Sequence, residues 1–143
     1  MSEREATARE AWLLMSDLVL DHERRREVAD ALGISFGRAR TVRRLARRPM
    51  SMRELADALG IDPPNATVVV DDLEARGLVR RKPHPTDRRA KLVEATRKGK
   101  AMARRADEIL ATPPPALAAL ADEDLEALLR ILERVPSGRP PSP

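Results

Sequence analysis

The 143-residue sequence contains no cysteine and no tyrosine, and Trp12 and Phe36 are its only tryptophan and phenylalanine. The lack of cysteine excludes a disulfide framework, a thiolate metal site and a thiol redox switch. With so few aromatic side chains, a hydrophobic core must be built from leucine, valine, isoleucine, alanine and methionine. The length suits one domain and is sufficient to bury such a core.

Long apolar runs are missing as well, since no stretch approaches the roughly 18 apolar residues of a membrane-spanning helix. The N-terminal Met-Ser-Glu-Arg-Glu carries charges of both signs, unlike a secretory signal. We therefore expect a cytoplasmic protein with no membrane partner. His22 and His84 are far apart, with no cysteine or acidic residue at metal-ligand spacing, so no metal or other cofactor is expected.

Charge is distributed unevenly along the chain. The formal net charge is +4, but residues 38–105 hold 19 Lys and Arg against 8 Asp and Glu. The two ends together hold 8 basic and 15 acidic residues. A basic middle between acidic ends is typical of a phosphate-binding centre whose flanks serve another purpose.

Two short helices with a tight turn between them are predicted within this basic region. Ser51 and Glu54 form a capping box at the start of the first helix, and Gly60 is suited to end it. Asp62 and Pro63 suit the N-cap and first position of the second helix. Apolar residues recur at helical spacing in both segments: Leu55, Ala56, Leu59, Ala66, Val69, Val70 and Leu73.

A charged hairpin follows, after Gly77 ends the second helix. Residues 78–82 and 88–95 are predicted to be strands, joined by a Pro-His-Pro-Thr-Asp turn. A helix pair followed by such a hairpin is the plan of a winged helix-turn-helix, which reads DNA.

Helical periodicity continues on both sides of this motif. Residues 5–31 are predicted to form one long helix or two abutting ones, and residues 34–48 another that carries six arginines and no acid. Thr96 is placed to cap a helix that Pro113-Pro114-Pro115 ends, and Asp122 to cap a last helix. Because the terminal helices have more apolar surface than one contact needs, they indicate a homodimer.

The fold class expected is mainly α with a small β-hairpin wing. Residues 1–32 are assigned to an N-terminal helical dimerisation segment and residues 33–99 to a winged helix-turn-helix DNA-binding domain. Residues 100–136 are assigned to C-terminal dimerisation helices, and the Pro- and Ser-rich residues 137–143 to a disordered tail. Such a dimer reads a pseudo-palindromic site with half-sites about 10 base pairs apart, or a multiple of that.

Residues 77–99 resemble the wing signature of the MarR family of transcriptional regulators. In that family a Gly-Leu-Ile-x-Arg strand leads to an Asp-Arg-Arg or Asp-x-Arg turn, and a Leu-Thr-x-x-Gly step opens the next helix. This sequence has Gly77-Leu78-Val79-Arg80-Arg81, Asp87-Arg88-Arg89 and Ala95-Thr96-Arg97-Lys98-Gly99. Residues 52–60 match the family's Leu-Ala-x-x-Leu helix, and the resemblance in pattern covers roughly residues 8–135.

The resemblance implies a homodimer with one winged helix-turn-helix per subunit. Members of the family are usually repressors that release operator DNA when a small, often phenolic or lipophilic, effector binds between the dimerisation helices and the DNA-reading lobe. Trp12, Met15, Phe36 and Arg40 are the candidate effector contacts, although the simpler interpretation of Trp12, Met15 and Phe36 is that they belong to the core. Thr67 is followed by Val68 where relatives often have arginine, so the operator sequence is expected to differ.

Ten residues are candidate DNA contacts. Arg88 and Arg89 at the wing tip suit a narrow minor groove, whose negative potential attracts guanidinium groups. Thr67 and Val68 lie away from the apolar stripe of the second motif helix, where they can meet base edges. The remaining candidates are Ser51, Arg53, Pro64, Asn65, Arg81 and His84. Asp87 is expected to brace the wing by an ion pair, with Arg40 or Arg44 as the partner.

Each of these assignments has a plainer alternative. Arg88 and Arg89 can belong to an ordinary solvated turn, and Asn65 can serve as a helix-capping residue.

Asp71 and Asp72 would repel phosphate, so only the first two turns of the second motif helix are expected to lie deep in a groove.

The function expected is that of a sequence-specific DNA-binding transcriptional regulator, a repressor released by a small-molecule ligand. The alternative is a sequence-indifferent nucleoid-associated protein of the same fold. A third possibility is a protein-interaction module whose basic stretch binds an acidic partner. An enzyme is not expected, because the sequence has no phosphate-binding glycine loop and no paired histidine and carboxylate at motif spacing.

Overall fold

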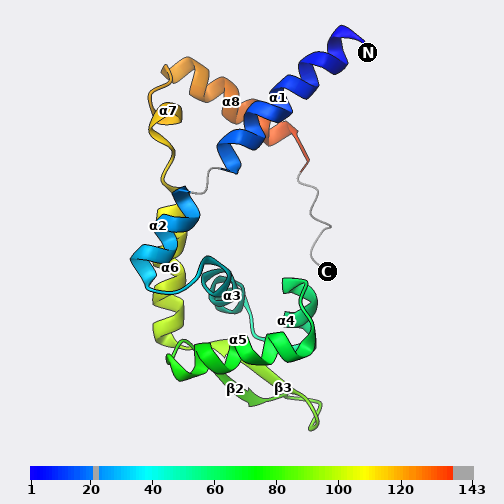
Figure 1. The fold of residues 1–143 in the computed structure, drawn as a ribbon, viewed down its shortest axis with the longest axis vertical. Coiled ribbons are helices and arrows are strands. Elements are labelled where there is room, and N and C mark those ends of the chain that lie inside the picture. Colours follow the sequence, from blue (N-terminus) through cyan, green and yellow to red (C-terminus); the bar gives the residue numbers. More distant parts are fainter. Residues whose placement is uncertain (21–22, 137–143) are drawn as a thin grey trace. The chain divides into compact units, whose positions relative to one another are not determined.

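The computed structural model describes residues 1–20 and 23–136 and divides into two units, residues 1–110 and 111–143 (Figure 1). His22 and the expected disordered tail at 137–143 lie outside the described residues. The helices and strands are α1 (Glu3–Val19), α2 (Glu23–Leu32), α3 (Phe36–Arg47), β1 (Met50–Ser51), α4 (Met52–Leu59), α5 (Pro63–Ala75), β2 (Val79–Pro83), β3 (Lys91–Ala95), α6 (Arg97–Ala111), α7 (Pro115–Ala118) and α8 (Asp122–Arg134). This confirms the prediction of a mainly helical fold with a small wing.

The three strands form an antiparallel sheet in the order β1-β3-β2. Strands β2 and β3 form the predicted hairpin, in which Val79 lies opposite Ala95 and Pro83 opposite Lys91. Strand β1 was not predicted, and it pairs Met50 with Val93. A strand of two residues is too short to show the alternation by which strands are recognised in a sequence.

The core of the first unit is aliphatic, as the scarcity of aromatic residues requires. It joins α2, α3, α4, α5 and α6 to one face of the sheet. The largest fully buried apolar side chains are Val28, Val42, Leu45, Leu55, Val70, Leu73, Leu78, Val79 and Val93. Phe36 packs against this core at the start of α3, with the Arg25 guanidinium 5.4 Å from the centroid of its ring.

Helix α1 differs from the other helices of this unit because none of its residues is buried. The prediction that Trp12 is a core residue was therefore wrong: 63% of its surface is exposed, as is 36% of Met15. The two residues carry the apolar periodicity of a packed helix, but the first unit does not cover them. No described helix has the length and apolar composition needed to span a membrane.

Local sequence signals set the ends of α4 and α5, as predicted. The Ser51 hydroxyl accepts a hydrogen bond from the Glu54 amide at 3.1 Å, and the Glu54 carboxylate accepts one from the Ser51 amide at 3.5 Å. Gly60 ends α4 with φ +66°, a conformation that favours glycine. The Asp62 carboxylate accepts from the Asn65 amide at 2.8 Å, which confirms it as the N-cap of α5.

Other helix boundaries differ from the prediction by a few residues. Residues 5–31 hold two helices, and α3 begins at Phe36 because the Ser35 hydroxyl caps it by accepting from the Arg38 amide at 3.2 Å. The N-cap of α8 is Ala121 and makes no side-chain hydrogen bond, so the assignment of Asp122 as cap was wrong. Asp122 is instead the first helical residue, where its charge favours the positive end of the helix dipole.

Candidate nucleic-acid interface

Helix α5 buries one side and exposes the other. Ala66, Val70 and Leu73 lie in the first unit's interior. The predicted DNA contacts on this helix are all exposed: Pro64, Asn65, Thr67 and Val68. The surface that α5 offers near its N-terminus is therefore small and largely uncharged.

Two of these exposed residues already make local hydrogen bonds. The Asn65 side-chain amide donates to the carboxylate of Asp62, the N-cap of α5, at 3.1 Å, so it already has a partner within the protein. The Thr67 hydroxyl donates to the Pro63 carbonyl at 3.1 Å and keeps its lone pairs as acceptors. Val68 is 59% exposed and offers only methyl groups.

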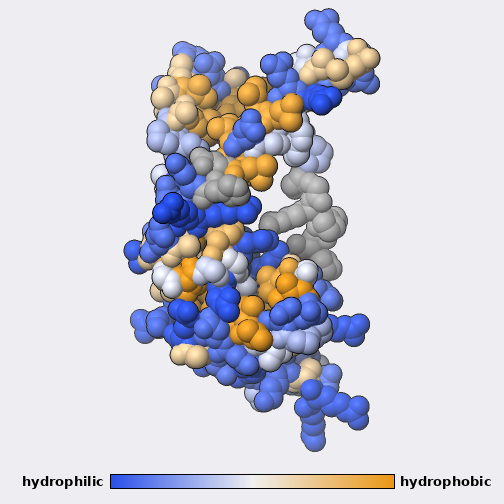
Figure 2. Space-filling view, in the orientation of Figure 1, coloured by the Kyte–Doolittle hydropathy of each residue, from blue (hydrophilic) through white to orange (hydrophobic). Residues whose placement is uncertain are grey.

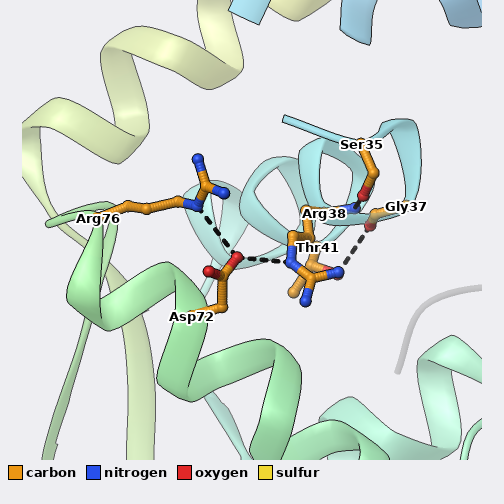
Figure 3. A network of polar contacts seen from close by, with 6 residues as sticks. All are labelled: Ser35, Gly37, Arg38, Thr41, Asp72 and Arg76. Atoms are coloured by element: carbon orange, nitrogen blue, oxygen red, sulfur yellow. Dashed lines mark hydrogen bonds and ion pairs between the residues drawn. The ribbon is translucent and has the colours of Figure 1, made fainter. Parts of the chain in front are cut away.

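The acidic residues in the second half of α5 are each bound by arginines. Asp72 accepts from Arg38 Nε at 2.6 Å and from Arg76 Nε at 3.1 Å (Figure 3). Asp71 and Glu74 are both bound by Arg81. Their negative charges are thus compensated within the protein, which reduces the repulsion of phosphate that the sequence alone predicts.

The Arg38–Asp72 pair links α3 to α5, and both side chains are about two-thirds covered. Figure 3 shows Arg38 on α3 directly after Gly37, whose carbonyl accepts a hydrogen bond from the Thr41 hydroxyl at 3.0 Å. The hydrogen bond from Arg38, followed by that from Arg76, lowers the pKa of Asp72 below its ordinary value of 3.8.

We expect Asp72→Asn to weaken the acid sensitivity of folding. Because the pKa of Asp72 is lowered in the folded protein, its charge stabilises the fold above the ordinary value of 3.8, and this contribution is lost as the pH falls below that value. The variant should therefore be less stable than the wild type at pH 7, with a smaller difference at pH 3. Urea unfolding at both pH values measures this. Asp57→Asn is the control, because Asp57 makes no ion pair within the described residues. An equal difference at the two pH values would contradict the role of this ion pair.

Arg81 anchors the wing to α5. Its Nη2 lies 2.6 Å from an Asp71 oxygen and its Nη1 lies 3.0 Å from a Glu74 oxygen, while its backbone amide donates to Glu74 at 3.2 Å. Arg81 was expected from the sequence to contact DNA, but its side chain is only 22% exposed and faces these carboxylates. We therefore interpret Arg81 as the residue that positions β2 against α5.

The wing turn is folded by hydrogen bonds to two side chains. His84 Nδ1 accepts from the Thr86 and Asp87 amides at 3.2 and 3.1 Å. The Asp87 carboxylate accepts from the Arg89 amide at 3.0 Å. The ion pair predicted for Asp87 was wrong, since no such pair is found in the part of the chain that the structure describes. We propose that Asp87 braces the wing through its hydrogen bond from the Arg89 amide instead. A main-chain donor two residues further on is closer to it than any distant arginine.

The wing tip presents free positive charge. Arg88 and Arg89 are exposed, and neither makes an ion pair with any residue described in the structure. The surface around the tip of the hairpin is hydrophilic (Figure 2). An exposed, flexible guanidinium without an internal partner is well suited to a negatively charged groove.

A hollow of about 540 Å³ separates the wing from the N-terminus of α4. It brings together five predicted DNA contacts: Ser51, Arg53, Arg81, His84 and Arg89. Lys91 also lines it, and this residue was missed in the sequence because a lone lysine at the start of a strand carries no signal. Glu54 at its edge is bound by Arg48 at 2.8 Å, and this bond lowers the pKa of Glu54. Asp87 also lines the hollow, so that four basic residues face two acidic ones there. This balance favours an anionic partner.

The four candidate effector residues do not gather at one site among the described residues. Arg40 lines a small hollow of about 190 Å³ with Ser35, Thr41, Leu59, Ile61 and Val69. Trp12, Met15 and Phe36 are not part of its lining. The structure of one chain thus offers no enclosed effector pocket formed by these four residues.

Comparison with known proteins adds to this geometry. Residues 26–90, from α2 to the wing turn, match the sequence model of the MarR family. The fold is similar to that of the transcriptional regulator BldR from Sulfolobus solfataricus, with 27% identity, 94% of this chain and 100% of that chain covered, and a TM-score of 0.62. It is also similar to RV1404 from Mycobacterium tuberculosis, with 27% identity, 93% and 91% covered, and a TM-score of 0.71. A MepR–DNA complex from S. aureus matches at 17% identity, with 85% and 96% covered and a TM-score of 0.61.

Proposed function

We propose that this chain belongs to the MarR family and acts as a sequence-specific DNA-binding transcriptional regulator. One observation carries the inference: the acids of α5 are all bound by arginines, whereas Arg88 and Arg89 of the wing are free of ion pairs to the described residues. The unpaired arginines of the wing attract a polyanion such as DNA, and the paired acids of α5 repel it little. The similarity to MepR, which was crystallised with DNA, supports this proposal.

Three parts of the first unit supply the proposed contacts. The first two turns of α5 enter the major groove, where Thr67 and Val68 meet base edges and a thymine methyl group. Arg88 and Arg89 reach the neighbouring minor groove. The hollow beside α4 binds backbone phosphate through Arg53 and the N-terminal amides of that helix. Phosphate contacts of this kind fix the register of the protein on DNA and make its affinity fall with salt.

A homodimer is the proposed assembly, with residues 1–32 and 100–136 as dimerisation segments. The exposed apolar side chains of α1 include Trp12, Leu13, Leu14, Leu18 and Val19, and Leu20 follows the helix directly. Those of the last helical segment include Leu129, Ile131, Leu132 and Val135 (Figure 2). Apolar surface of this extent on a soluble protein marks an interface. A second copy of the chain supplies a partner with the same apolar character, and two-fold symmetry then matches a pseudo-palindromic operator.

Repression with release by a ligand is the proposed mode of regulation. A small lipophilic or phenolic effector would bind preferentially to dimers in which the two copies of α5 are wrongly spaced for the operator. It would thereby lower the fraction of dimers that can bind DNA. Trp12, Met15, Phe36 and Arg40 remain the proposed effector contacts. Titration of a panel of phenolic compounds into the protein–operator complex tests this mode, because release should depend on compound concentration.

Sequence-indifferent binding is the second candidate, and one observation favours it. The Asn65 side-chain amide is bound to the Asp62 carboxylate and the Val68 side chain has no polar atoms, so the exposed face of α5 offers few groups that distinguish bases. Competition with random DNA separates the two functions. A regulator keeps its operator in excess competitor, whereas a sequence-indifferent protein does not.

Arg88→Ala should weaken operator binding by about 1–3 kcal/mol, because a guanidinium inserted in the minor groove is removed. Thermal unfolding should be unchanged, since Arg88 makes no ion pair within the described residues. Fluorescence anisotropy with labelled operator measures the affinity. Arg26→Ala is the control, because it removes an exposed arginine from α2. Unchanged operator affinity in Arg88→Ala would refute the assignment of the wing.

A further inference from the structure

A second cationic hollow, of about 480 Å³, lies where β2, β3 and α6 meet. Its lining comprises Arg80, Glu94, Ala95, Thr96, Arg97, Lys100 and Arg104. Arg80 and Glu94 lie opposite each other in the hairpin, on the face of the sheet turned away from the buried Val79 and Val93. This hollow is distinct from the one beside α4, with which it shares no lining residue.

The charge of this hollow is strongly unbalanced. Glu94 is its one acidic lining residue, and it is bound by Arg80 at 2.6 Å and by Lys82 at 2.7 Å. The hydrogen bond from Lys82 lowers the pKa of Glu94 most, and that from Arg80 lowers it further. Both cations compensate the charge of the carboxylate. The carboxylate therefore has little negative charge left for the remaining cations.

Arg97, Lys100 and Arg104 form an exposed basic stripe on α6. Their spacing places them on one face of the helix, where like charges repel. None of them makes an ion pair with a residue that the structure describes. Asp107 of the same helix is engaged elsewhere, with Arg43 of α3 at 2.6 Å. Three uncompensated cations on one helix face are unfavourable for folding and suit an anionic partner instead.

We propose that this hollow, defined by Arg80, Arg97, Lys100 and Arg104, binds backbone phosphates of the DNA that flanks each half-site. This inference rests on the proposed function and extends the contact beyond α5 and the wing tip. The side chains involved are exposed, and a small free anion would gain little from such solvated ion pairs. DNA already held by α5 and the wing presents its phosphates at a high effective concentration and releases counterions on binding.

The strand connection gives this surface a direct relation to the wing. Arg80 directly precedes Arg81 in β2, and Arg81 holds that strand against α5 through Asp71 and Glu74. Phosphate bound at the hollow would therefore act on the same hairpin that carries Arg88 and Arg89. The contact with flanking DNA would thereby support the position of the wing in its groove.

The test compares two operator duplexes, one limited to the two half-sites and one extended on both sides, with the full-length protein. The wild type should bind the extended duplex about 10-fold more tightly, a gain typical of a few added phosphate contacts. Arg97→Gln combined with Arg104→Gln should abolish this gain and leave the affinity for the short duplex unchanged. The slope of log K against log salt on the extended duplex should become shallower by about 0.9 for each phosphate that the variant no longer neutralises.

Arg26→Gln combined with Arg105→Gln is the matched control, because it likewise removes two exposed arginines without touching the hollow. Equal affinity of the wild type for both duplexes would overturn the proposal, as would an equal loss of affinity in this control. Failure of the proposed function itself is distinguishable, since the wild type would then show no preference for the short operator duplex over random DNA.

Discussion

Gly99→Ala is expected to destabilise the protein by about 3 kcal/mol, at the upper end of the range for overpacking. Gly99 lies in the first turn of α6, and a Cβ atom added there would collide with the backbone carbonyl oxygen of Leu78. The same carbonyl accepts a hydrogen bond from the Thr96 amide at 3.0 Å, and the Thr96 hydroxyl donates to the Gly77 carbonyl at 2.6 Å. A methyl group would force α6 away from the start of β2 and break these bonds.

Gly37→Ala provides the matched control for this substitution. Gly37 lies in α3, and nothing is within 4 Å of the position that its Cβ would occupy. Alanine should stabilise this helix by roughly 0.5–1 kcal/mol, because it loses less backbone entropy on folding than glycine does. Urea unfolding measures both variants. A Gly99→Ala protein as stable as the wild type would show that α6 does not pack closely on the Leu78 carbonyl.

Leu14→Glu combined with Leu18→Glu should convert the protein to a monomer and reduce operator affinity at least about 100-fold. The two leucines lie one turn apart on α1, are more than half exposed, and line an apolar hollow on that helix. Two carboxylates buried in a dimer interface would be unpaired, which is strongly unfavourable. A monomer binds one half-site and forgoes the gain of roughly 10²–10⁴ that linked binding provides.

Arg9→Glu is the control for this prediction, since it changes the charge of α1 by the same amount without removing an apolar side chain. Sedimentation measures the oligomeric state, and anisotropy measures operator affinity. Circular dichroism of the whole protein should show an unchanged helical signal, because α1 buries no residue in the first unit. A double variant that remains dimeric, or a monomer that keeps full affinity, would refute the proposed assembly.

Features encoded by neighbouring residues were predictable from the sequence. The capping box of Ser51 and Glu54 spans four residues, and Gly60 and Asp62 act on the turn in which they lie. The wing signature at residues 77–99 likewise indicated the hairpin, because its turn and strand residues are contiguous. Such signals depend on local backbone geometry and are not altered by the rest of the fold.

Contacts between distant segments were not predictable. The six arginines of residues 38–48 have similar sequence surroundings, and nothing in the sequence shows which of them meets an acid. Arg40 or Arg44 was expected to meet Asp87, whereas Arg38 binds Asp72 and Arg43 binds Asp107. These pairs join residues 34 and 64 positions apart. Which arginine pairs with which acid depends on how α3, α5 and α6 are placed relative to one another in the fold.

The candidate DNA contacts include residues whose surroundings were predictable from the sequence and residues whose surroundings were not. Arg88 and Arg89 were recognised from the turn motif and are exposed without ion-pair partners among the described residues. Arg81 belongs to the same motif, but its role in holding β2 against α5 depends on Asp71 and Glu74, which only the fold brings near. A charged residue in a DNA-binding motif can therefore position the interface without touching DNA.

Fluorescence anisotropy with DNA from upstream of the protein's own gene tests the central claim most directly. The titration should be made with excess random competitor and at two salt concentrations. We expect binding that survives the competitor, weakens with salt, and saturates at one dimer per palindrome. Binding that the competitor abolishes, on this DNA and on fragments selected from the whole genome, would contradict a sequence-specific regulator and favour a sequence-indifferent DNA-binding protein.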